Sequence, residues 1–389
     1  MRIAIVQETV DTQRGGAETS TRELAGHLAA LGVEVTVVHR GERAAPLTAE
    51  GVTYVPIAAP GFSRALRTYR FVQAVPGVCR ELRCDLVHAI TPCLCADVYQ
   101  PRGGTFAETV ARGLAAARSP AARAVKRVGR LFNVRQRFLL RLERTLLRRR
   151  PARVVVAAVS RYVGRQVTEG YGFPAERTRV IFNGVDVAPP AEGERERRRQ
   201  ERRSALGLEG RVPLVLFVAH NFKLKGLEAL LCALADQADA GAEPCHVVVA
   251  GRDRPERYRR LAGRLGLGER VHFVGVRTPI REWYAAADVL AHPTWYDPCS
   301  RVVLEALVLG LPVVTTRLNG AAEVMEPGRH GEVIATPADT AGLAACLRRA
   351  LDPAVGAACR ADAARLHGVL SMARHARELK ALYEELATR

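Results

Sequence analysis

The most informative residues are two acids, Asp297 and Glu305, which stand eight positions apart in WYDPCSRVVLEALVLGLPVVTT. Pro298 fits a first helical turn and Gly310 fits a helix end, which predicts a helix over residues 299–309. Asp297 then precedes the helix, and Glu305 lies two turns in on nearly the same face. The free amides of a first helical turn bind phosphate, whereas carboxylates suit hydroxyl groups. The pattern favours a ligand with phosphates between hydroxyls, such as a nucleotide sugar. A capping Asp with a solvated Glu is the structural alternative.

Lysine use gives the second indication, because only four of the 58 Lys and Arg residues are lysine. Two of the four, Lys223 and Lys225, stand in LVLFVAHNFKLKGLEAL, which predicts a strand over 214–219, a loop, and a helix from Gly226. Compact charges beside free helix amides indicate a phosphate site, and solvated loop lysines are the alternative. This loop and the Asp297 loop both follow strands, so we expect them at the carboxyl edge of one parallel sheet.

Length and composition describe a globular chain with room for two domains. The 389 residues are 48% hydrophobic and 25% charged, and no apolar run approaches the roughly 18 residues that span a bilayer. The first apolar stretch is too short for a signal peptide and meets Glu8 at once. Nine cysteines, an odd number without a CxxC pair, suggest reduced thiols. We therefore expect a cytoplasmic protein.

Strands and helices alternate along both halves of the chain. The first half runs from RIAIVQE to TRVIFNGVD, and the second from PLVLFVAH to PVVTT and a Gly-Glu loop. Valine-rich strands that alternate with helices predict an α/β protein with parallel, doubly wound sheets. We place a first Rossmann-like domain at 1–186, joined by a C-terminal helix at about 370–389 that packs back on it. A second Rossmann-like domain covers 187–369.

Several enzyme classes are excluded by missing motifs. The first loop, ETVDTQRGGAETS, is neither a P-loop nor GxGxxG, and no acid follows the next strand, so a dinucleotide oxidoreductase is not expected. Gly15 and Gly16 let the backbone approach a ligand, or form a plain turn. No DxD, HExxH, GxSxG or Cys/His metal spacing occurs, so neither a metal nor another cofactor is predicted. His88 and His292 are interpreted as structural residues, with His292 supporting the Asp297 loop.

The net charge of +18 points to an anionic partner. Thirteen basic residues and the single acid Glu143 lie between Arg118 and Arg153. Apolar and basic residues alternate at helical spacing over 118–150, which suits a peripheral contact with an anionic membrane; a solvated basic helix is the alternative. A nucleic-acid-binding protein would also be basic, but aromatics are 5% of residues and no stacking pattern appears.

These motifs together resemble those of the family 4 (group 1) retaining glycosyltransferases of the GT-B fold. The resemblance rests on the Gly-Gly loop, NGVD at 183–186, Lys225-Gly226, and an acid–x7–Glu pair before GLPVV. It covers most of the chain, is strongest over 214–337, and is closest to lipopolysaccharide core glucosyltransferases. It implies two doubly wound Rossmann-like domains facing across a cleft, the first for the acceptor and the second for the donor.

The resemblance also implies residue roles. Lys225, helped by Lys223, would bind the diphosphate, Glu305 the ribose hydroxyls, and Asp297 the transferred sugar. The family's donor contacts also map to other positions of this chain, namely Gly15, Gly16, Ser300, Arg301 and Val302. Two departures stand out, because the family's first acid is usually Glu and its next Gly is Ser300 here. A transferase that binds its donor without turning it over is therefore an alternative.

We predict transfer of a hexose from a nucleotide diphosphate sugar, with UDP-glucose the first candidate, to a sugar hydroxyl. The anomeric configuration would be retained, no metal would be needed, and the acceptor would be a lipopolysaccharide core sugar or another glycolipid or glycan. A sugar-nucleotide epimerase or hydrolase on the same fold is the enzymatic alternative. The expected location is the cytoplasmic face of the membrane.

Overall fold

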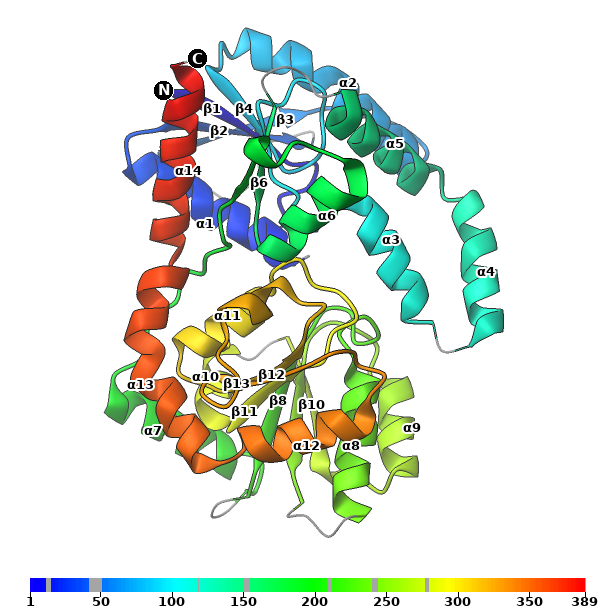
Figure 1. Ribbon diagram of the computed structural model, residues 1–389, viewed down its shortest axis with the longest axis vertical. Coiled ribbons are helices and arrows are strands. Elements are labelled where there is room, and N and C mark those ends of the chain that lie inside the picture. The colour runs from blue at the N-terminus through cyan, green and yellow to red at the C-terminus, as the bar shows by residue number, and fades with distance from the viewer. Residues whose placement is uncertain are drawn as a thin grey trace. The chain divides into compact units, whose positions relative to one another are not determined.

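The chain forms two compact units, each built around one parallel sheet (Figure 1). The units are Met1–Asp186 with Ser371–Arg389, and Val187–Leu370. The computed structural model describes residues 1–11, 15–41, 51–117, 119–149, 154–208, 212–239, 244–276 and 280–388. Within these ranges no helix combines the length and the hydropathy that a bilayer crossing requires.

The first unit contains, in its described part, a seven-stranded sheet in the order β3-β2-β1-β4-β5-β6-β7. Its strands are β1 Arg2–Val6, β2 Glu34–Arg40, β3 Val52–Ile57, β4 Leu86–Ala89, β5 Val98–Tyr99, β6 Val155–Ala158 and β7 Thr178–Val180. Its helices are α1 Gly16–Ala30, α2 Arg64–Glu81, α3 Phe106–Ala115, α4 Pro120–Leu131, α5 Val134–Arg149, α6 Arg161–Tyr171 and α14 Met372–Ala387. The central strands are buried on both faces, as the Val-rich sequence predicts for a covered parallel sheet.

Helix α14 completes the core of the first unit although it comes from the other end of the chain. Met372, Leu379 and Tyr383 are buried in one cluster with Leu24 and Leu28 of α1. Ser371 caps the helix, its Oγ accepting a hydrogen bond from the Arg374 amide at 3.3 Å. The apolar face of α14 therefore covers the sheet on the face that α1 also covers.

The second unit contains, among described residues, a six-stranded sheet in the order β10-β9-β8-β11-β12-β13. Its strands are β8 Leu214–Val218, β9 His246–Ala250, β10 Val271–Gly275, β11 Val289–His292, β12 Val313–Thr316 and β13 Gly331–Ile334. Its helices are α7 Glu192–Ser204, α8 Leu227–Asp239, α9 Glu256–Arg264, α10 Ile280–Ala286, α11 Arg301–Val308, α12 Thr340–Ala350 and α13 Pro353–Leu370. The order reverses between β8 and β11, which is the switch point where α/β sheets bind ligands.

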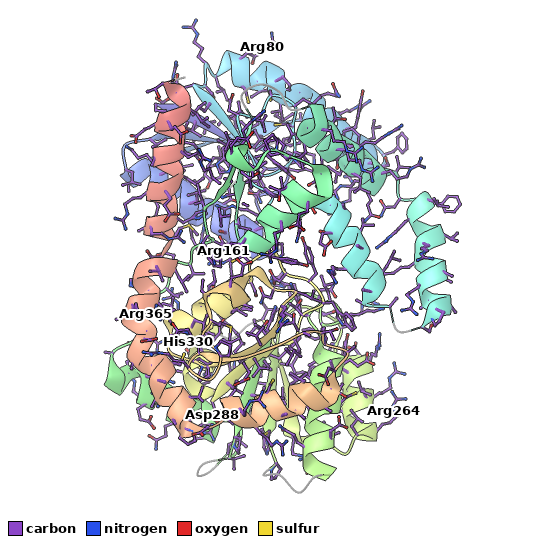
Figure 2. The ribbon with its side chains drawn as sticks, in the orientation of Figure 1. Arg80, Arg161, Arg264, Asp288, His330 and Arg365 are labelled. Carbon is purple, nitrogen blue, oxygen red and sulfur yellow. The ribbon has the colours of Figure 1, made fainter. Side chains whose placement is uncertain are left out.

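Buried and half-buried ion pairs attach the outer helices of the second unit. Arg199 and Arg203 of α7 pair with Asp288 (labelled in Figure 2), which stands before β11, at 2.6 and 3.3 Å. Asp362 of α13 accepts bonds from Arg329 at 2.7 and 2.8 Å, from Arg365 and from buried His330. Some of the charged residues of α7 thus attach this helix to the rest of the unit, while others face solvent.

The sequence analysis misplaced a few elements. The segment read as a Gly-Glu loop contains strand β13, which pairs with β12 in parallel register. Helix α11 begins at Arg301 after Ser300, so Pro298 lies before the helix and not in its first turn. Helices α6, α12 and α13 were not predicted. The apolar residues of α13 give a weak helical period, whereas those of α6 and α12 recur at helical spacing and could have been used.

Candidate functional site

The loop between β8 and α8 is locked onto the segment that follows β11. The Asn221 side chain accepts from the Leu224 amide at 2.9 Å, which closes the loop into a turn. The Leu224 carbonyl then accepts from the Trp295 amide at 2.8 Å and from Thr294 Oγ1 at 3.2 Å. These bonds bring the lysine loop to the acid loop, as we expected from the parallel sheet.

Gly226 allows this close approach. Its φ of +82° lies in the region that favours glycine, and an added Cβ would stand 1.9 Å from the carbonyl oxygen of Pro293. Any side chain at this position would push the lysine loop away from β11. The glycine after Lys225 therefore has a packing reason, independent of any contact with a ligand.

Lys225 and Asp297 form the central ion pair of the site. The Lys225 Nζ lies 2.6 Å from Asp297 Oδ2 and 3.0 Å from the Tyr296 carbonyl oxygen. The two side chains are 18% and 13% exposed. Burial alone would raise the pKa of Asp297, but the charge of Lys225 and the bond from His292 hold that pKa below its ordinary value. Asp297 is therefore an ionised acceptor at neutral pH.

Lys223, expected to assist, is half-buried in the same loop. In the described part of the chain no carboxylate forms an ion pair with it. Its ammonium group is thus on the same loop as Lys225 but is not neutralised by Asp297. The two lysines differ in this respect, which sequence spacing could not indicate.

His292, the last residue of β11, supports the acid loop by direct contact, as predicted. Its Nε2 lies 3.5 Å from Asp297 Oδ2 and 3.3 Å from Ser300 Oγ, and its ring stacks on Phe217. Burial lowers the pKa of His292, so the ring is neutral at pH 7. Asp297 is also held through its backbone, because its amide donates to Leu318 and its carbonyl accepts from Gly320.

Glu305 lies in the second turn of α11 and is held by two neighbours. Tyr284 of α10 donates to Glu305 Oε2 at 3.0 Å, and Arg301 NH2 is 3.2 Å from Oε1. Tyr284 is buried, and its hydroxyl pKa is raised by that burial. Each carboxylate oxygen has a second lone pair, so Glu305 can still accept from ligand hydroxyls.

One of the amides that we expected to contact phosphate has a protein partner. The Ser300 amide donates to the side-chain oxygen of Asn319 at 3.1 Å, and Ser300 is buried. The Arg301 and Val302 amides follow in the first turn of α11, where no earlier carbonyl of the helix can accept from them. The anion contacts expected of the Arg301 and Val302 amides at this helix start stay predictions.

A cavity of about 550 Å³ opens beside the lysine loop, at the carboxyl ends of β9 and β10. Asp253 on its wall accepts from the Phe222 amide at 2.8 Å, which ties the cavity to the loop. Gly251 has φ +146°. A Cβ at this position would stand 1.7 Å from the carbonyl oxygen of Ala219, the residue that follows β8. The lining groups include aromatic, charged and backbone atoms, among them Phe222, Arg252, Asp253, Arg259, Phe273 and Gly275.

Gly15 and Gly16 belong to the first unit. Gly15 is extended, with φ 171°, and Gly16 is the first residue of α1. Among the described residues, therefore, the structure brings together Lys223, Lys225, Asp297 and the start of α11 in the second unit. His88 is buried, and its Nδ1 lies 2.5 Å from the Tyr383 hydroxyl, so its contacts are those of a packing residue.

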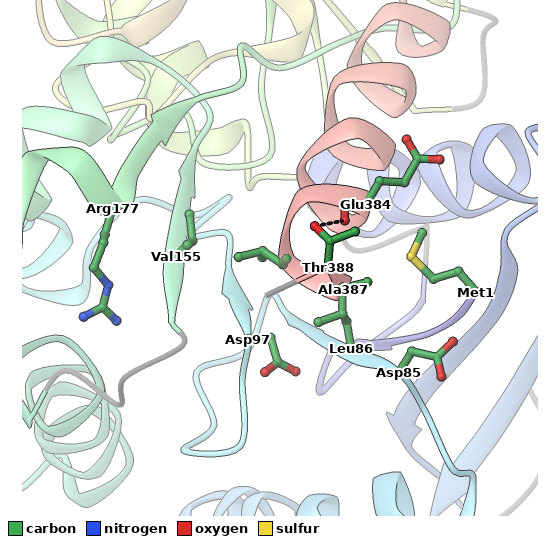
Figure 3. Close-up of a pocket in the computed structure, with 10 residues that line it drawn as sticks. Met1, Asp85, Leu86, Asp97, Val155, Arg177, Glu384, Ala387 and Thr388 are labelled. Carbon is green, nitrogen blue, oxygen red and sulfur yellow. Dashed lines mark hydrogen bonds between the residues drawn. The ribbon is translucent and has the colours of Figure 1, made fainter.

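Another cavity, of about 700 Å³, lies in the first unit (Figure 3). Leu86 and Val155 line it at the amino ends of β4 and β6, with the end of α14 and the acids Asp85 and Asp97. Ligands of parallel α/β sheets bind at the opposite, carboxyl edge. None of the predicted site residues lines this cavity.

Sequence reasoning missed Tyr284, Asn319 and Asp253. Tyr284 and Asn319 bond from other elements to Glu305 and Ser300, and Asp253 bonds to the lysine loop, so no local spacing could have found them. Among the described residues, no group of three or more His, Cys, Asp or Glu side chains is placed to hold a metal ion.

The chain is similar in sequence and in fold to known glycosyltransferases. The lipopolysaccharide glucosyltransferase WaaG of Escherichia coli is 36% identical over 145 residues, which are 37% of this chain and 39% of that protein. The chain thus spans about two fifths of that relative's length. The crystal structure of a WaaG glycosyltransferase aligns with 93% of this chain and 95% of its own, with a TM-score of 0.75 and 24% identity. Anabaena HepE in complex with UDP-glucose aligns with 99% of this chain and 100% of its own, with a TM-score of 0.72 and 20% identity.

Two models of one enzyme family account for most of the sequence. The model described as glycosyltransferase family 4 matches residues 14–189, and that described as glycosyl transferases group 1 matches 212–353. The second match contains the lysine loop, the acid loop and α11. With its two parallel α/β sheets, the chain therefore belongs to the family 4, group 1 glycosyltransferases of the GT-B fold.

Proposed function

We propose that this protein transfers a hexose from a nucleotide diphosphate sugar to a sugar hydroxyl, with retained anomeric configuration and without a metal. The observation that carries the proposal is the Lys225–Asp297 pair, held beside the first turn of α11. That arrangement offers a cation and the amides at a helix start to a diphosphate, and a carboxylate to the hydroxyls next to it. A hydrolase or epimerase would use the same donor contacts, and only the products distinguish it.

Donor binding rearranges charges that are already paired. Lys225 is neutralised by Asp297 before the donor arrives, so the diphosphate must share or take over its ammonium group. Lys223 and the Arg301 and Val302 amides would complete the phosphate contacts. Asp297 then directs its remaining lone pairs to the hydroxyls of the transferred sugar. Glu305, positioned by Tyr284, would accept from the ribose hydroxyls.

The reaction requires charge stabilisation more than acid–base groups. As the bond to the diphosphate breaks, the cations and amides stabilise the leaving group, and its phosphate oxygen takes the proton of the attacking hydroxyl. The acceptor oxygen then bonds to the anomeric carbon on the face that the diphosphate leaves. His292 is buried, and its Nε2 faces Asp297 and Ser300, so it positions the loop and is not placed to take a proton from the acceptor.

The cavity of about 550 Å³ beside the lysine loop is the proposed position of the nucleobase. Phe222 and Phe273 offer apolar faces, and backbone groups at Val274 and Gly275 offer hydrogen bonds. UDP-glucose is the first donor to test, since HepE has been crystallised with UDP-glucose and WaaG is named a glucosyltransferase. The name of WaaG also supports a lipopolysaccharide core sugar, or another glycolipid or glycan, as acceptor.

The first unit is proposed to bind this acceptor and to contact an anionic membrane through residues 118–150. Helix α4 has no buried residue, and the apolar residues on and after it are exposed, for example Phe132 at 78%. Two of the basic side chains bond to the protein itself, because Lys126 and Arg130 donate to backbone carbonyls of α3. The remaining arginines beside exposed apolar groups suit a peripheral contact at the cytoplasmic face. Gly15 and Gly16 are proposed to let the backbone approach the sugar closely.

A thermal-shift panel of UDP-, GDP- and ADP-sugars tests the donor. A donor at 100 times its dissociation constant adds about 2.7 kcal/mol to the unfolding free energy, enough to rank the three bases. NMR of the products then separates a transferase, which needs an acceptor, from a hydrolase or epimerase. If no nucleotide sugar in the panel raised the melting temperature, and UDP did not raise it either, the proposed function would be refuted.

A further inference from the structure

Four arginines gather around the carboxylate that follows β1 in the first unit. We call Arg40, Arg64, Arg67 and Arg135 the arginine cluster. Its centre is Glu8, which is buried and lies 2.6 Å from Arg135 NH2 and 3.3 Å from Arg40 Nε. Arg40 ends β2 and the Glu8 amide is held by a residue that follows β4, so the cluster lies at the carboxyl edge of the sheet. That edge is where parallel α/β sheets bind ligands.

Thr68 brings helix α2 into the cluster. Its hydroxyl donates to Glu8 Oε1 at 2.6 Å and accepts from Arg135 Nε at 2.9 Å. Arg64 lies one helical turn before Thr68 and therefore on the same side of α2, with Arg67 next to it. The pKa of Arg40 is lowered first by burial and then by the charges of the other three arginines, although Glu8 opposes this. The Arg40 guanidinium group thus lies close enough to each of the other three to be repelled by them.

Among the described residues, the cluster holds more positive charge than its one carboxylate neutralises. Four arginines against one glutamate leave a formal charge of 4 − 1 = +3. In the described part of the chain, the ion pairs of the cluster are those of Arg40 and Arg135 with Glu8. Arg64 and Arg67 are exposed, whereas the Nε of Arg40 faces Glu8 at 3.3 Å. An anion is the group that this arrangement lacks.

The position of Arg64 and Arg67 on α2 is unfavourable for the free protein. They occupy the first and fourth positions of an 18-residue helix, with no acid in its first turn. Cations destabilise a helix amino end, whereas anions stabilise it. Phe62, just before the capping residue Ser63, is 97% exposed instead of packing on the fourth position. Local rules broken together at one place commonly mark a binding site.

We propose that the arginine cluster binds a phosphate monoester carried by the acceptor. The guanidinium fork matches phosphate oxygens, and a dianion offsets most of the +3 charge. Exposed Phe62 offers an apolar face for the sugar that bears the phosphate. The inference rests on the proposed function, because it assigns this phosphate to the acceptor and not to the donor. The same chemistry fits a sugar phosphate or a phospholipid headgroup, which the experiment separates.

The test compares wild type with R64Q/R67Q and with the control R80Q/R83Q. The control removes the same charge at the far end of α2 (Arg80 is labelled in Figure 2). Arg135 is left intact, because its loss would strand the buried Glu8. Saturating UDP fills the donor site throughout, so that phosphate probes cannot bind there. The probes are glucose 6-phosphate, glucose, and phosphatidylcholine vesicles with and without phosphatidic acid.

We expect a phosphorylated probe to bind R64Q/R67Q at least about tenfold more weakly than wild type or the control. This follows from the loss of charge-assisted hydrogen bonds of about 1.5 kcal/mol or more. Glucose, which has no phosphate, should bind wild type and both variants with the same affinity. Loss of glucose 6-phosphate binding identifies a sugar phosphate, and loss of phosphatidic acid binding alone identifies a headgroup. Equal binding of both probes by wild type and R64Q/R67Q, or an equal loss in the control, overturns the site.

Stability gives an independent check. Without phosphate, R64Q/R67Q should melt at the same or a higher temperature than wild type, because two cations leave the amino end of α2. A lower melting temperature would mean that these arginines stabilise the fold, and the inference would be wrong. Stabilisation by UDP is read separately: its absence in wild type refutes the proposed donor but leaves the phosphate comparison valid.

Discussion

Replacement of Lys225 by alanine should separate catalysis from folding at this site. The substitution removes the cation expected at the leaving diphosphate. It also leaves Asp297, 13% exposed, without the ammonium group 2.6 Å away. Breaking a buried ion pair by removing one partner costs about 3–5 kcal/mol, and the residual exposure of both groups puts this pair at about 3 kcal/mol. Turnover should fall by about two to three orders of magnitude, by analogy with the loss of one oxyanion donor.

The double variant K225A/D297N distinguishes the two effects. Without the carboxylate no buried charge is left unpaired, so most of the lost unfolding free energy should return. Turnover should stay low, because the cation is still missing. Lys380 provides a matched control, since it lies on α14 and pairs there with Glu384. K380A should change stability by less than about 0.5 kcal/mol and leave turnover unchanged.

The assays are urea unfolding and release of UDP from UDP-glucose at saturating donor, with and without acceptor. Near-normal turnover in folded K225A would show that this ammonium group does not stabilise the leaving diphosphate. Recovery of turnover in K225A/D297N would equally refute the assignment, because it would trace the defect to the stranded carboxylate. Low turnover in both variants, with stability restored in the second, is the expected result.

Further predictions concern the residues around this pair. G226A should lower the unfolding free energy by at least about 1–3 kcal/mol in urea titrations, since a Cβ cannot fit at φ +82° against Pro293. Y284F should raise the donor KM about two- to tenfold with a smaller change in kcat, because Glu305 loses one fixed bond of about 0.5–1.5 kcal/mol. The Asp297 pKa is depressed in the folded protein, so its contribution to stability is complete above about pH 3.9 and is lost below it; the stability difference between wild type and D297N should shrink only in that acid range. F132S should weaken binding to anionic vesicles in sedimentation assays without changing donor binding, and unchanged sedimentation would exclude α4 from the contact.

The sequence predicted the elements that carry strong periodic or turn signals. Strand β8, the lysine loop and α8 were expected at 214–219, 220–225 and from Gly226, and are observed with β8 at Leu214–Val218 and α8 from Leu227. The expectation that the lysine and acid loops meet needed only the rule that parallel strands end at one edge. It did not need knowledge of the Trp295–Leu224 bond that fixes their distance.

Partners from distant elements could not be predicted. The bond from Tyr284 to Glu305 depends on how α10 packs, and the Asn319 side chain that takes up the Ser300 amide comes from the turn after β12. Nothing in the spacing of WYDPCSRVVLEAL encodes either contact. The amide of Ser300 was assigned to phosphate from a helix rule that counts free donors but cannot see a side chain that caps one of them.

The site residues share a property that bears on specificity. Lys225 is held by Asp297, Glu305 by Tyr284 and Arg301, and Ser300 by Asn319, so these charged and polar groups have protein partners before any ligand binds. Affinity is then the difference between ligand contacts and the internal contacts that they replace. A sugar without a diphosphate offers nothing to compete with Asp297 for the ammonium group, and a diphosphate without hydroxyls leaves the freed carboxylate unpaired. Under the proposed roles, only a ligand that carries both can exchange the whole set, so the arrangement should select a nucleotide sugar over either of its halves.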